Sequence, residues 1–598
     1  MNKRQLINKV KELEGLTKDE KNYLVNIVNY SKEYGLVWEN KPEIVEEELK
    51  TKLPILKEIK EKAIIKDTEE ESYPNHILIE GDNLHALTTL SFTHENKIDI
   101  IYIDPPYNTG NKDDFIYNDH YIDKEDTYRH SKWLSFMSKR LEIAKRLLKE
   151  DGVIFCSIGD DEQSQLKLLC DEIFGELNFI SNVTRIAKRT SDKGTYFKPT
   201  KDYILTYAKN ISNLSGFGVP KTDDIKKYKF KDEKGIYKKN GASLYQPSLD
   251  SRPNQRYWIE CPDGSFVIPP GNNYPKEKKD ASFLKPESND DKVWRWSWMT
   301  YLKNKDKLIF TKASKKSPLI NENLEQSKWN IYDKVYWSKL KGATNLPEDV
   351  IYDHKNSKGT KHILGMGIKF SFSKPFELIE HLLTITQKRK DATILDFFAG
   401  SGTTLESVMR MNDKDKGSRK AIIVTNNENN IADKVTYRRI KTVINGYLDI
   451  KTKLKVLPLS KNNLRYFQCN YVERKPSLKN KKELTKLATE LLCIKEECYY
   501  EVTSEINKHK WNRLFTDRNG LYNYVIYDDL HIDTAVNDLT KFIENKENKP
   551  KVKVYVFSNG QYPYTEDFED VHEYVELCAL PDVIYKAYQN VLPKVSKF

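Results

Sequence analysis

Residues 98–106 read IDIIYIDPP, an almost continuous apolar run that ends in an acidic residue and two prolines. A similar run, HILIEGD, stands at residues 76–82. Short runs that are apolar at nearly every position are typical of strands buried on both faces of a parallel sheet. These two segments therefore predict the start of an α/β domain near residue 71.

Beyond residue 128 the sequence alternates between helical and strand patterns. Trp133, Phe136, Leu141 and Ala144 share one face of a predicted helix, which Gly152 ends. The alternation continues with helices at 165–175 and 376–386 and strands at 153–158, 203–207, 392–398 and 420–428. This order predicts a doubly wound, Rossmann-like sheet with right-handed crossovers.

Two other stretches depart from that alternation. A Lys-, Asn- and Tyr-rich segment holds six of the nine tryptophans, and we predict that it is an inserted domain. Near the N-terminus, Leu6, Val10 and Leu13 have helical spacing, which predicts a small helical region. The predicted divisions are a helical region at 1–70, α/β halves at 71–210 and 366–450, the insertion at 211–365, and a C-terminal α/β region at 451–598.

Composition narrows the class of protein. The net charge of +11 suits a phosphate-backbone partner without requiring one. Seven scattered cysteines form no CxxC pair, which predicts reduced thiols and no metal site. The N-terminus lacks the apolar core of a signal peptide, and no apolar run reaches the ~20 residues of a membrane helix. We therefore expect a cytoplasmic protein without a membrane partner.

The turn Asp104-Pro105-Pro106-Tyr107 is the strongest chemical signal, and we predict that these four residues are catalytic. Two prolines stiffen the turn and remove two N–H donors, so the neighbouring carboxylate and carbonyls can face a ligand. If Asp104 and the Pro105 carbonyl accept the hydrogens of a base amino group, its nitrogen gains nucleophilicity, while Tyr107 stacks on the extruded base. A rigid turn with a solvated aspartate is the alternative interpretation.

The segment ILDFFAGSGTT at 394–404 is the second signal. A buried strand ends at Asp396, and a turn with Gly400 and Gly402 leads into a helix, as where nucleotide-like ligands bind in such sheets. The motif lacks a third glycine and has no lysine after GSG, which disfavours a phosphate site. Asp396 could meet the ammonium of S-adenosylmethionine. From this motif alone, a plain strand-to-helix turn and a dinucleotide site stay open.

Two further carboxylates follow predicted strands. Glu428 is placed to take ribose hydroxyls, and Asp82 follows HILIEG. Both can equally be carboxylates of a turn or of a helix start.

The order of these motifs resembles a known family. Six segments occur in the order seen in the modification subunits of Type III restriction-modification systems, within the beta class of DNA amino-methyltransferases. They are GDNLHAL, IDPPYNTG, VIFCSIGDDE, FSFSKP, LDFFAGSGTT and VTNNENN. The resemblance implies a permuted methyltransferase fold whose insertion recognises the target sequence. It implies S-adenosylmethionine contacts from Asp82, Lys374, Asp396, Phe398, Gly400 and Gly402.

The same resemblance implies a function. DPPY is more similar to adenine-N6 than to cytosine-N4 enzymes, so the expected reaction is methylation of adenine N6 in double-stranded DNA. A homodimer with a separate helicase-nuclease restriction subunit is expected, with the region from 451 in subunit association. One alternative is a stand-alone epigenetic or phage-defence methyltransferase. Another is a non-catalytic DNA-recognition subunit, and the intact Asp104 and Tyr107 disfavour this second alternative.

Overall fold

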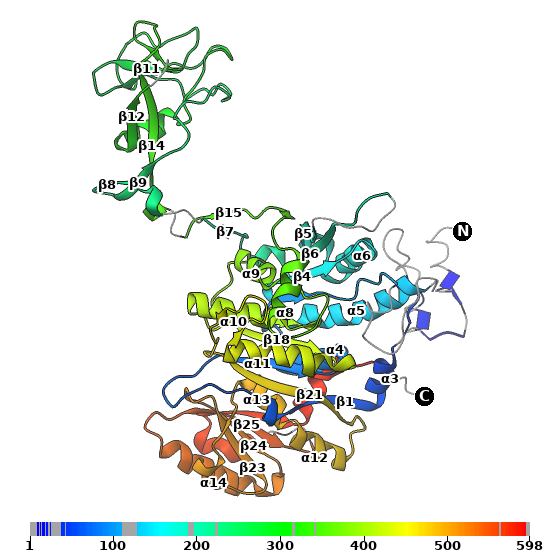
Figure 1. Cartoon of the computed structure of the whole chain (residues 1–598). Helices are drawn as coiled ribbons and strands as arrows, with labels where there is room; N and C mark the ends of the chain where they lie inside the picture. The colour runs from blue at the N-terminus through cyan, green and yellow to red at the C-terminus, as the bar shows by residue number, and fades with distance from the viewer. Residues whose placement is uncertain are drawn as a thin grey trace. The chain divides into compact units, whose positions relative to one another are not determined.

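The computed structural model describes residues 38–593 except 42, 111–127, 189–195, 222–224, 314–316, 340–341, 561 and 563, with a few isolated positions before residue 38. The chain divides into two compact units, residues 1–217 with 348–598 and residues 218–347 (Figure 1). No helix in these described parts is long and apolar enough to span a bilayer.

A ten-stranded sheet is the framework of the first unit. Its order is β1 (Lys52–Glu58), β21 (Asn463–Glu473), β2 (Asn75–Glu80), β18 (Lys420–Thr425), β17 (Thr393–Asp396), β3 (Ile98–Ile103), β4 (Leu148–Ile158), β6 (Lys201–Ala208), β5 (Phe179–Ile186) and β16 (Val350–Ile351). The six strands from β21 to β4 run parallel. The predicted α/β fold is confirmed, and every strand predicted in the two halves is present.

The sheet is mixed rather than parallel throughout. Strand β6 runs antiparallel to both of its neighbours, β4 and β5. At the opposite edge, β1 runs antiparallel to β21.

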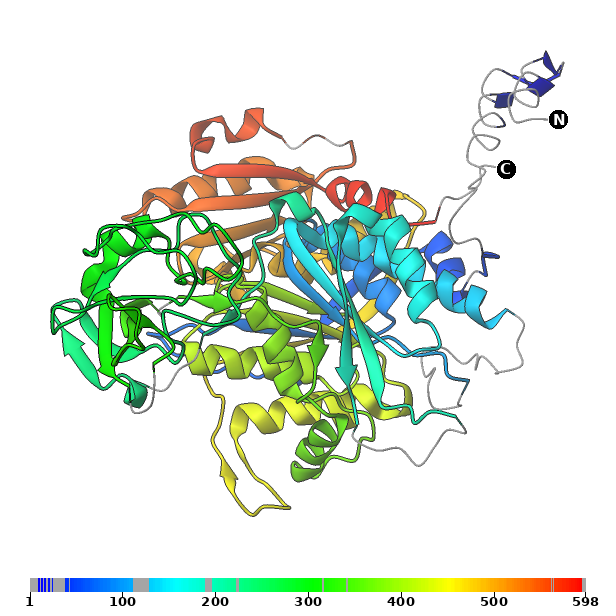
Figure 2. The ribbon, with the colours of Figure 1, turned by 90° about the horizontal axis from the view of Figure 1, so that it is seen from above.

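Helices cover both faces of the parallel part. In Figure 2, α4 (Asn83–Thr93), α5 (Arg129–Leu147) and α6 (Gln163–Phe174), in blue to cyan, lie on one face, and α9 (Phe376–Ile385), α10 (Thr403–Asp415) and α11 (Arg438–Asn445), in green to yellow, lie on the other. The short helix α8 (Asn356–Gly365) precedes α9. Leu78, Ile101 and Ile154 are fully or almost fully buried between these layers, which explains the apolar runs in the sequence.

The prediction of a helical region over residues 1–70 is wrong for its last part. Helix α3 spans Ile44–Thr51, but residues 52–58 form the edge strand β1. Leu53, Ile55 and Leu56 are buried there, and Pro54 is tolerated because an edge strand does not need every N–H for the ladder. Most of residues 1–37, including Leu6, lies outside the described residues.

The C-terminal region contains an α/β layer of its own, but the predicted division at residue 451 is wrong. Strand β21 lies between β1 and β2 and so belongs to the main sheet. The remainder forms a five-stranded sheet, β22 (Tyr500–Glu501), β23 (Asn512–Thr516), β24 (Leu521–Ile526), β25 (Lys551–Phe557) and β26 (Val575–Leu580), with helices α12 (Leu478–Leu487), α13 (Thr489–Glu496), α14 (Ile532–Glu544) and α15 (Asp582–Gln589). Helices α13 and α15 pack on α4, so the two sheets share one core.

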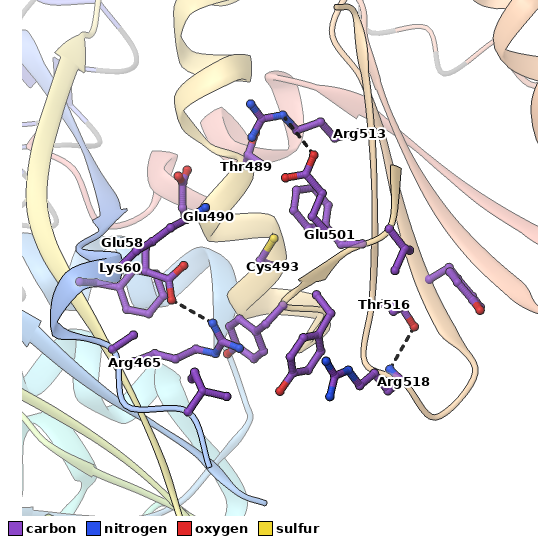
Figure 3. Close-up of a pocket in the computed structure, with 18 of the residues that line it drawn as sticks. Glu58, Lys60, Arg465, Thr489, Glu490, Cys493, Glu501, Arg513, Thr516 and Arg518 are labelled. Atoms are coloured by element: carbon purple, nitrogen blue, oxygen red, sulfur yellow. Dashed lines mark hydrogen bonds and ion pairs between the residues drawn. The ribbon is translucent and has the colours of Figure 1, made fainter. Parts of the chain in front are cut away.

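A cavity of about 650 Å³ lies where β1 and β21 meet the C-terminal sheet. Figure 3 shows opposite charges paired around it: Arg465 Nη1 lies 2.9 Å from Glu58 Oε1, and Arg513 faces Glu501. The Arg465 guanidinium also lies 4.1 Å from the centre of the Tyr499 ring. None of the residues predicted to be catalytic or cofactor-binding lines this cavity.

The second unit, residues 218–347, is shorter than the predicted insertion, because 211–217 and 348–365 lie in the first unit. Its sheets are β12 (Leu308–Lys312), β14 (Trp329–Tyr336), β9 (Gly235–Lys239) and β8 (Phe230–Asp232); β10 (Ile259–Glu260), β11 (Phe266–Ile268) and β13 (Ile320–Asn321); and β15 (Thr344–Asn345) with β7 (Val219–Pro220). Helix α7 spans Trp298–Asn304. Trp294 is fully buried in a core with Tyr257 and Ile259.

Candidate active site

Four neighbouring parallel strands end at one edge of the main sheet. Along the order β2, β18, β17 and β3, their carboxyl ends lead to Asp82, Glu428, Asp396 and Asp104 respectively. In open α/β sheets, this edge is where ligands bind. The topology therefore brings together carboxylates that lie up to 346 positions apart in the sequence.

The DPPY turn is held from two sides. Pro105 and Pro106 are buried, and the indole Nε1 of Trp133 on α5 donates a hydrogen bond of 2.8 Å to the Pro106 carbonyl. Burial, and then the nearby Asp104 carboxylate, raise the pKa of Tyr107 well above its usual range. Its hydroxyl is therefore protonated at neutral pH, and the residue is an uncharged aromatic group.

Lys374 reaches the catalytic turn from the other half of the domain. Its ammonium Nζ donates to Asp104 Oδ1 at 2.6 Å, to Asp104 Oδ2 at 2.5 Å and to the Tyr107 hydroxyl at 3.0 Å. The ammonium also lies 5.1 Å from the centre of the Tyr107 ring. The family resemblance implied that Lys374 contacts the cofactor, and the structure places its charged end on the predicted catalytic residues Asp104 and Tyr107.

The glycine turn follows β17 directly. Gly400 and Gly402 have φ values of 49° and 77°, in the left-handed region that favours glycine. Asp396 is buried and accepts hydrogen bonds from the Phe398 N–H at 3.0 Å and the Thr404 hydroxyl at 2.5 Å. Burial raises the pKa of Asp396 to about 7. This carboxylate therefore shapes the turn and carries only part of its charge at neutral pH.

A buried ion pair supports that turn from beneath. Arg439 Nε lies 2.6 Å from Glu406 Oε2, and both side chains are fully buried. The Arg439 Nη1 donates to the Ser401 hydroxyl at 2.9 Å and to the Thr403 hydroxyl at 2.8 Å. The Ser373 hydroxyl lies 3.0 Å from that of Ser401, so the residue before Lys374 is tied to the glycine turn.

The other predicted cofactor residues lie around the same edge. Asp82 caps α4 by accepting from the Leu84 N–H at 2.7 Å, which is the helix-start role that the sequence left open. The neighbouring Asn83 donates to the Phe397 carbonyl at 3.0 Å and so joins α4 to the glycine turn. The Phe398 ring packs near Phe136, with centroids 5.8 Å apart. Glu428 begins a 3-10 turn three residues beyond β18.

One supporting group was missed in the sequence. Glu162 is fully buried, and its Oε1 accepts from the Asn108 amide at 2.5 Å and contacts His130 Nδ1 at 2.7 Å. Asn108 directly follows DPPY, so Glu162 fixes the exit of the catalytic turn. An acidic residue at the end of VIFCSIGDDE, after a predicted neighbouring strand, was the available signal.

The assembled site can bind a flat polar group. Asp104 has two acceptor oxygens, which contact Lys374 in this structure, and Tyr107 has an aromatic ring, while the glycine turn brings open backbone near them. Among the described residues, no group of three or more His, Cys, Asp or Glu side chains could hold a metal ion.

Comparison with known proteins identifies related sequences. The family model described as DNA methylase matches residues 98–433. The EcoPI Mod subunit of a Type III restriction-modification enzyme, from Escherichia phage P1, is 34% identical over 60% of this chain and 59% of its own length. The EcoP15I Mod subunit from Escherichia coli is 30% identical over 66% of this chain and 64% of its length. The Type II methyltransferase M.KpnI from Klebsiella pneumoniae is 32% identical over 61% of this chain and 84% of its own length.

These matches differ in how much of each protein they cover. The matched part of the chain spans less than two thirds of the length of either Mod subunit. The family match, in contrast, covers more than half of the 598 residues and includes both the DPPY turn and the glycine turn. The chain therefore belongs to the DNA methylase family.

Proposed function

We propose that this chain transfers a methyl group from S-adenosylmethionine to N6 of an extruded adenine in double-stranded DNA, as the modification subunit of a Type III restriction-modification system. The observation that carries the proposal is that Asp104 and Tyr107 follow β3, directly beside the glycine turn that follows β17. A reacting group and its donor need such neighbouring positions to meet in line.

The catalytic half supplies the geometry. Asp104 and the Pro105 carbonyl accept the two N6 hydrogens, which shifts electron density onto the nitrogen and directs its lone pair out of the ring plane. Tyr107 stacks on the extruded base and holds it against the turn. Extrusion is required because N6 cannot reach an in-line position inside a stacked duplex.

The cofactor half fits S-adenosylmethionine, which supplies an electrophilic methyl group when bound. A Cβ on Gly400 would meet only the Phe398 carbonyl, at 3.9 Å, so the turn leaves space for a ligand against its backbone. Asp396 would face the methionyl ammonium, and Phe398, Gly400 and Gly402 would form the floor. The remaining proposed cofactor contacts are Asp82, Glu428 and Lys374. They come from both halves of the domain, whose motifs stand in the permuted order.

Recognition and assembly extend the proposal. Residues 218–347 form a unit of their own, which suits a target-recognition domain, and the net charge of +11 suits a DNA partner. Two relatives are named Mod subunits, and this name supports a separate restriction subunit as a partner. The homodimer, and the role of the C-terminal region in subunit association, are part of the same proposal. Light scattering of the intact chain tests the dimer: a monomeric mass would reject it.

The reaction itself is tested with the purified chain alone. DNA is incubated with tritiated S-adenosylmethionine, without ATP and without a restriction subunit, and the methylated nucleosides are separated. N6-methyladenine is expected, because both chemical turns lie in this chain. Exclusive formation of N4-methylcytosine, or methylation of RNA only, would contradict the substrate assignment.

A further inference from the structure

Lys374 occupies the position that the target amino group needs. Its ammonium contacts both carboxylate oxygens of Asp104 and the Tyr107 hydroxyl, and its side chain is only 10% exposed. The proposed mechanism requires those same carboxylate oxygens to accept hydrogens from a base. One ammonium and one amino group cannot both occupy this space, so the lysine end has to leave before a base enters.

The backbone of Lys374 is fixed, so only its side chain can make this movement. A Cβ on Gly359 of α8 would stand 2.6 Å from the Lys374 carbonyl carbon, which shows how closely the two backbones approach. The Thr403 hydroxyl donates to the Lys374 carbonyl at 3.4 Å, and Ser373 bonds to Ser401. Lys374 is thus anchored on the glycine turn while its charge lies on the catalytic turn.

A ligand on the glycine turn would compete for this charge. S-adenosylmethionine carries one carboxylate, and the ammonium of Lys374 starts from a backbone that touches the turn. An ion pair with the ligand would draw the lysine away from Asp104 and leave the carboxylate open. For the lysine, a contact with the carboxylate of the ligand replaces the contact with Asp104.

We propose that Lys374 locks the target-base site in the cofactor-free chain and that the carboxylate of the bound cofactor releases it. This inference rests on the proposed function. Cofactor and target base then bind cooperatively, since the first ligand has already removed the contact that the second must break. Lys374 acts here as a positioning residue, through Asp104.

The test measures the dissociation constant of a fluorescent duplex by anisotropy, with and without saturating S-adenosylhomocysteine. The duplex carries the recognition sequence, found by sequencing DNA that the wild-type chain has methylated. The wild-type chain should bind at least about tenfold more tightly with this ligand, within the usual range of coupling between two sites. 5′-Methylthioadenosine, which lacks the amino acid end, should produce no tightening.

Lys374→Met should abolish the coupling, because no lock remains. Its cofactor-free affinity for DNA should equal that of the wild-type chain with S-adenosylhomocysteine. Lys388→Met is the matched control: Lys388 is 11% exposed and paired with Asp151, and its loss should leave the coupling unchanged. Lys374→Arg keeps the positive charge and should therefore retain the coupling between cofactor binding and DNA binding.

The outcomes separate the two proposals. A wild-type chain that does not methylate DNA overturns the proposed function. A chain that methylates, yet shows equal coupling with and without the lysine, overturns the lock alone. If Lys374→Met does not fold, the wild-type chain still tests the lock through a comparison of the two ligands. Should 5′-methylthioadenosine tighten DNA binding as much as S-adenosylhomocysteine does, the role of the carboxylate is rejected.

Discussion

The Tyr107 ring lies directly against Gly159: a Cβ atom placed on Gly159 would stand 2.8 Å from Tyr107 Cδ2. Gly159 follows β4, and Tyr107 lies beyond β3, its parallel neighbour. Because Gly159 has no side chain, the aromatic ring of Tyr107 can lie against its backbone.

Gly159→Ala should therefore displace Tyr107 and lower methyl transfer by about tenfold, because the stacking surface for the base moves. Cofactor affinity should stay unchanged, since the glycine turn is not touched. Initial methylation rates and calorimetric titration of the cofactor measure both. Gly216→Ala is the control, because a Cβ there meets nothing within 4 Å. An equal loss in both variants would reject the steric argument.

The framework of the fold was predictable because the buried parallel strands carry a strong local signal. Strands β2, β3, β17 and β18 each contain a short apolar run, and an acidic residue stands at or soon after the end of each run. The strand at 52–58 was missed, since KLPILKE carries charges at both ends and follows a helical pattern. Its partner β21 lies more than 400 residues away, and no local pattern reports such a pairing.

The site was predictable as a set of residue types, but its pairings were not. Asp104 and Asp396 were recognised because each closes a strand within an unusual turn. The contact of Lys374 with Asp104 joins positions 270 residues apart, and only the strand order brings them together. Likewise, Arg439 and Glu406 lie outside the motifs recognised in the sequence, so their buried pairing required the structure.

Asp396 should make both stability and cofactor affinity depend on pH. Burial raises the pKa of Asp396 from 3.8 to about 7, so between these values the folded chain holds a proton that the unfolded chain has lost. Stability should therefore fall as pH rises through this window. Cofactor affinity should rise about tenfold from pH 5.5 to 7, because the ionised carboxylate meets the ammonium.

Asp396→Asn should remove both pH dependences, since its amide does not titrate in this range. Thermal unfolding and calorimetry at matched pH values provide the measurements. A variant that keeps the wild-type slope would show that another group titrates.

Arg439→Met should destabilise the first unit by about 3 kcal/mol, because Glu406 loses its main partner inside the core. His362 and Arg410 also contact Glu406, which keeps the loss at the lower end of the range for a broken buried pair. Urea unfolding gives the free energy. The control is Arg389→Met, whose exposed pair with Asp391 should contribute little to the free energy of unfolding. Similar values for both variants would contradict the supporting role of Arg439.

Asp104→Ala should separate chemistry from cofactor binding. The change removes the acceptor for the N6 hydrogens, so methyl transfer should fall by at least about 100-fold, the scale of one lost preorganised polar contact in a transition state. Cofactor affinity should not decrease, because the glycine turn stays intact and Lys374 loses its competing partner. Asp151→Ala, which also removes a lysine-paired carboxylate but outside the site, is the control and should methylate normally.

Asp396→Ala should show the opposite pattern, with weaker cofactor binding as the primary defect, since a charged hydrogen-bonded contact contributes about 1.5 to 3 kcal/mol. Calorimetric titration and single-turnover methylation of each variant distinguish these roles. If Asp104→Ala bound no cofactor while Asp396→Ala bound it normally, the catalytic and cofactor halves would have to be exchanged.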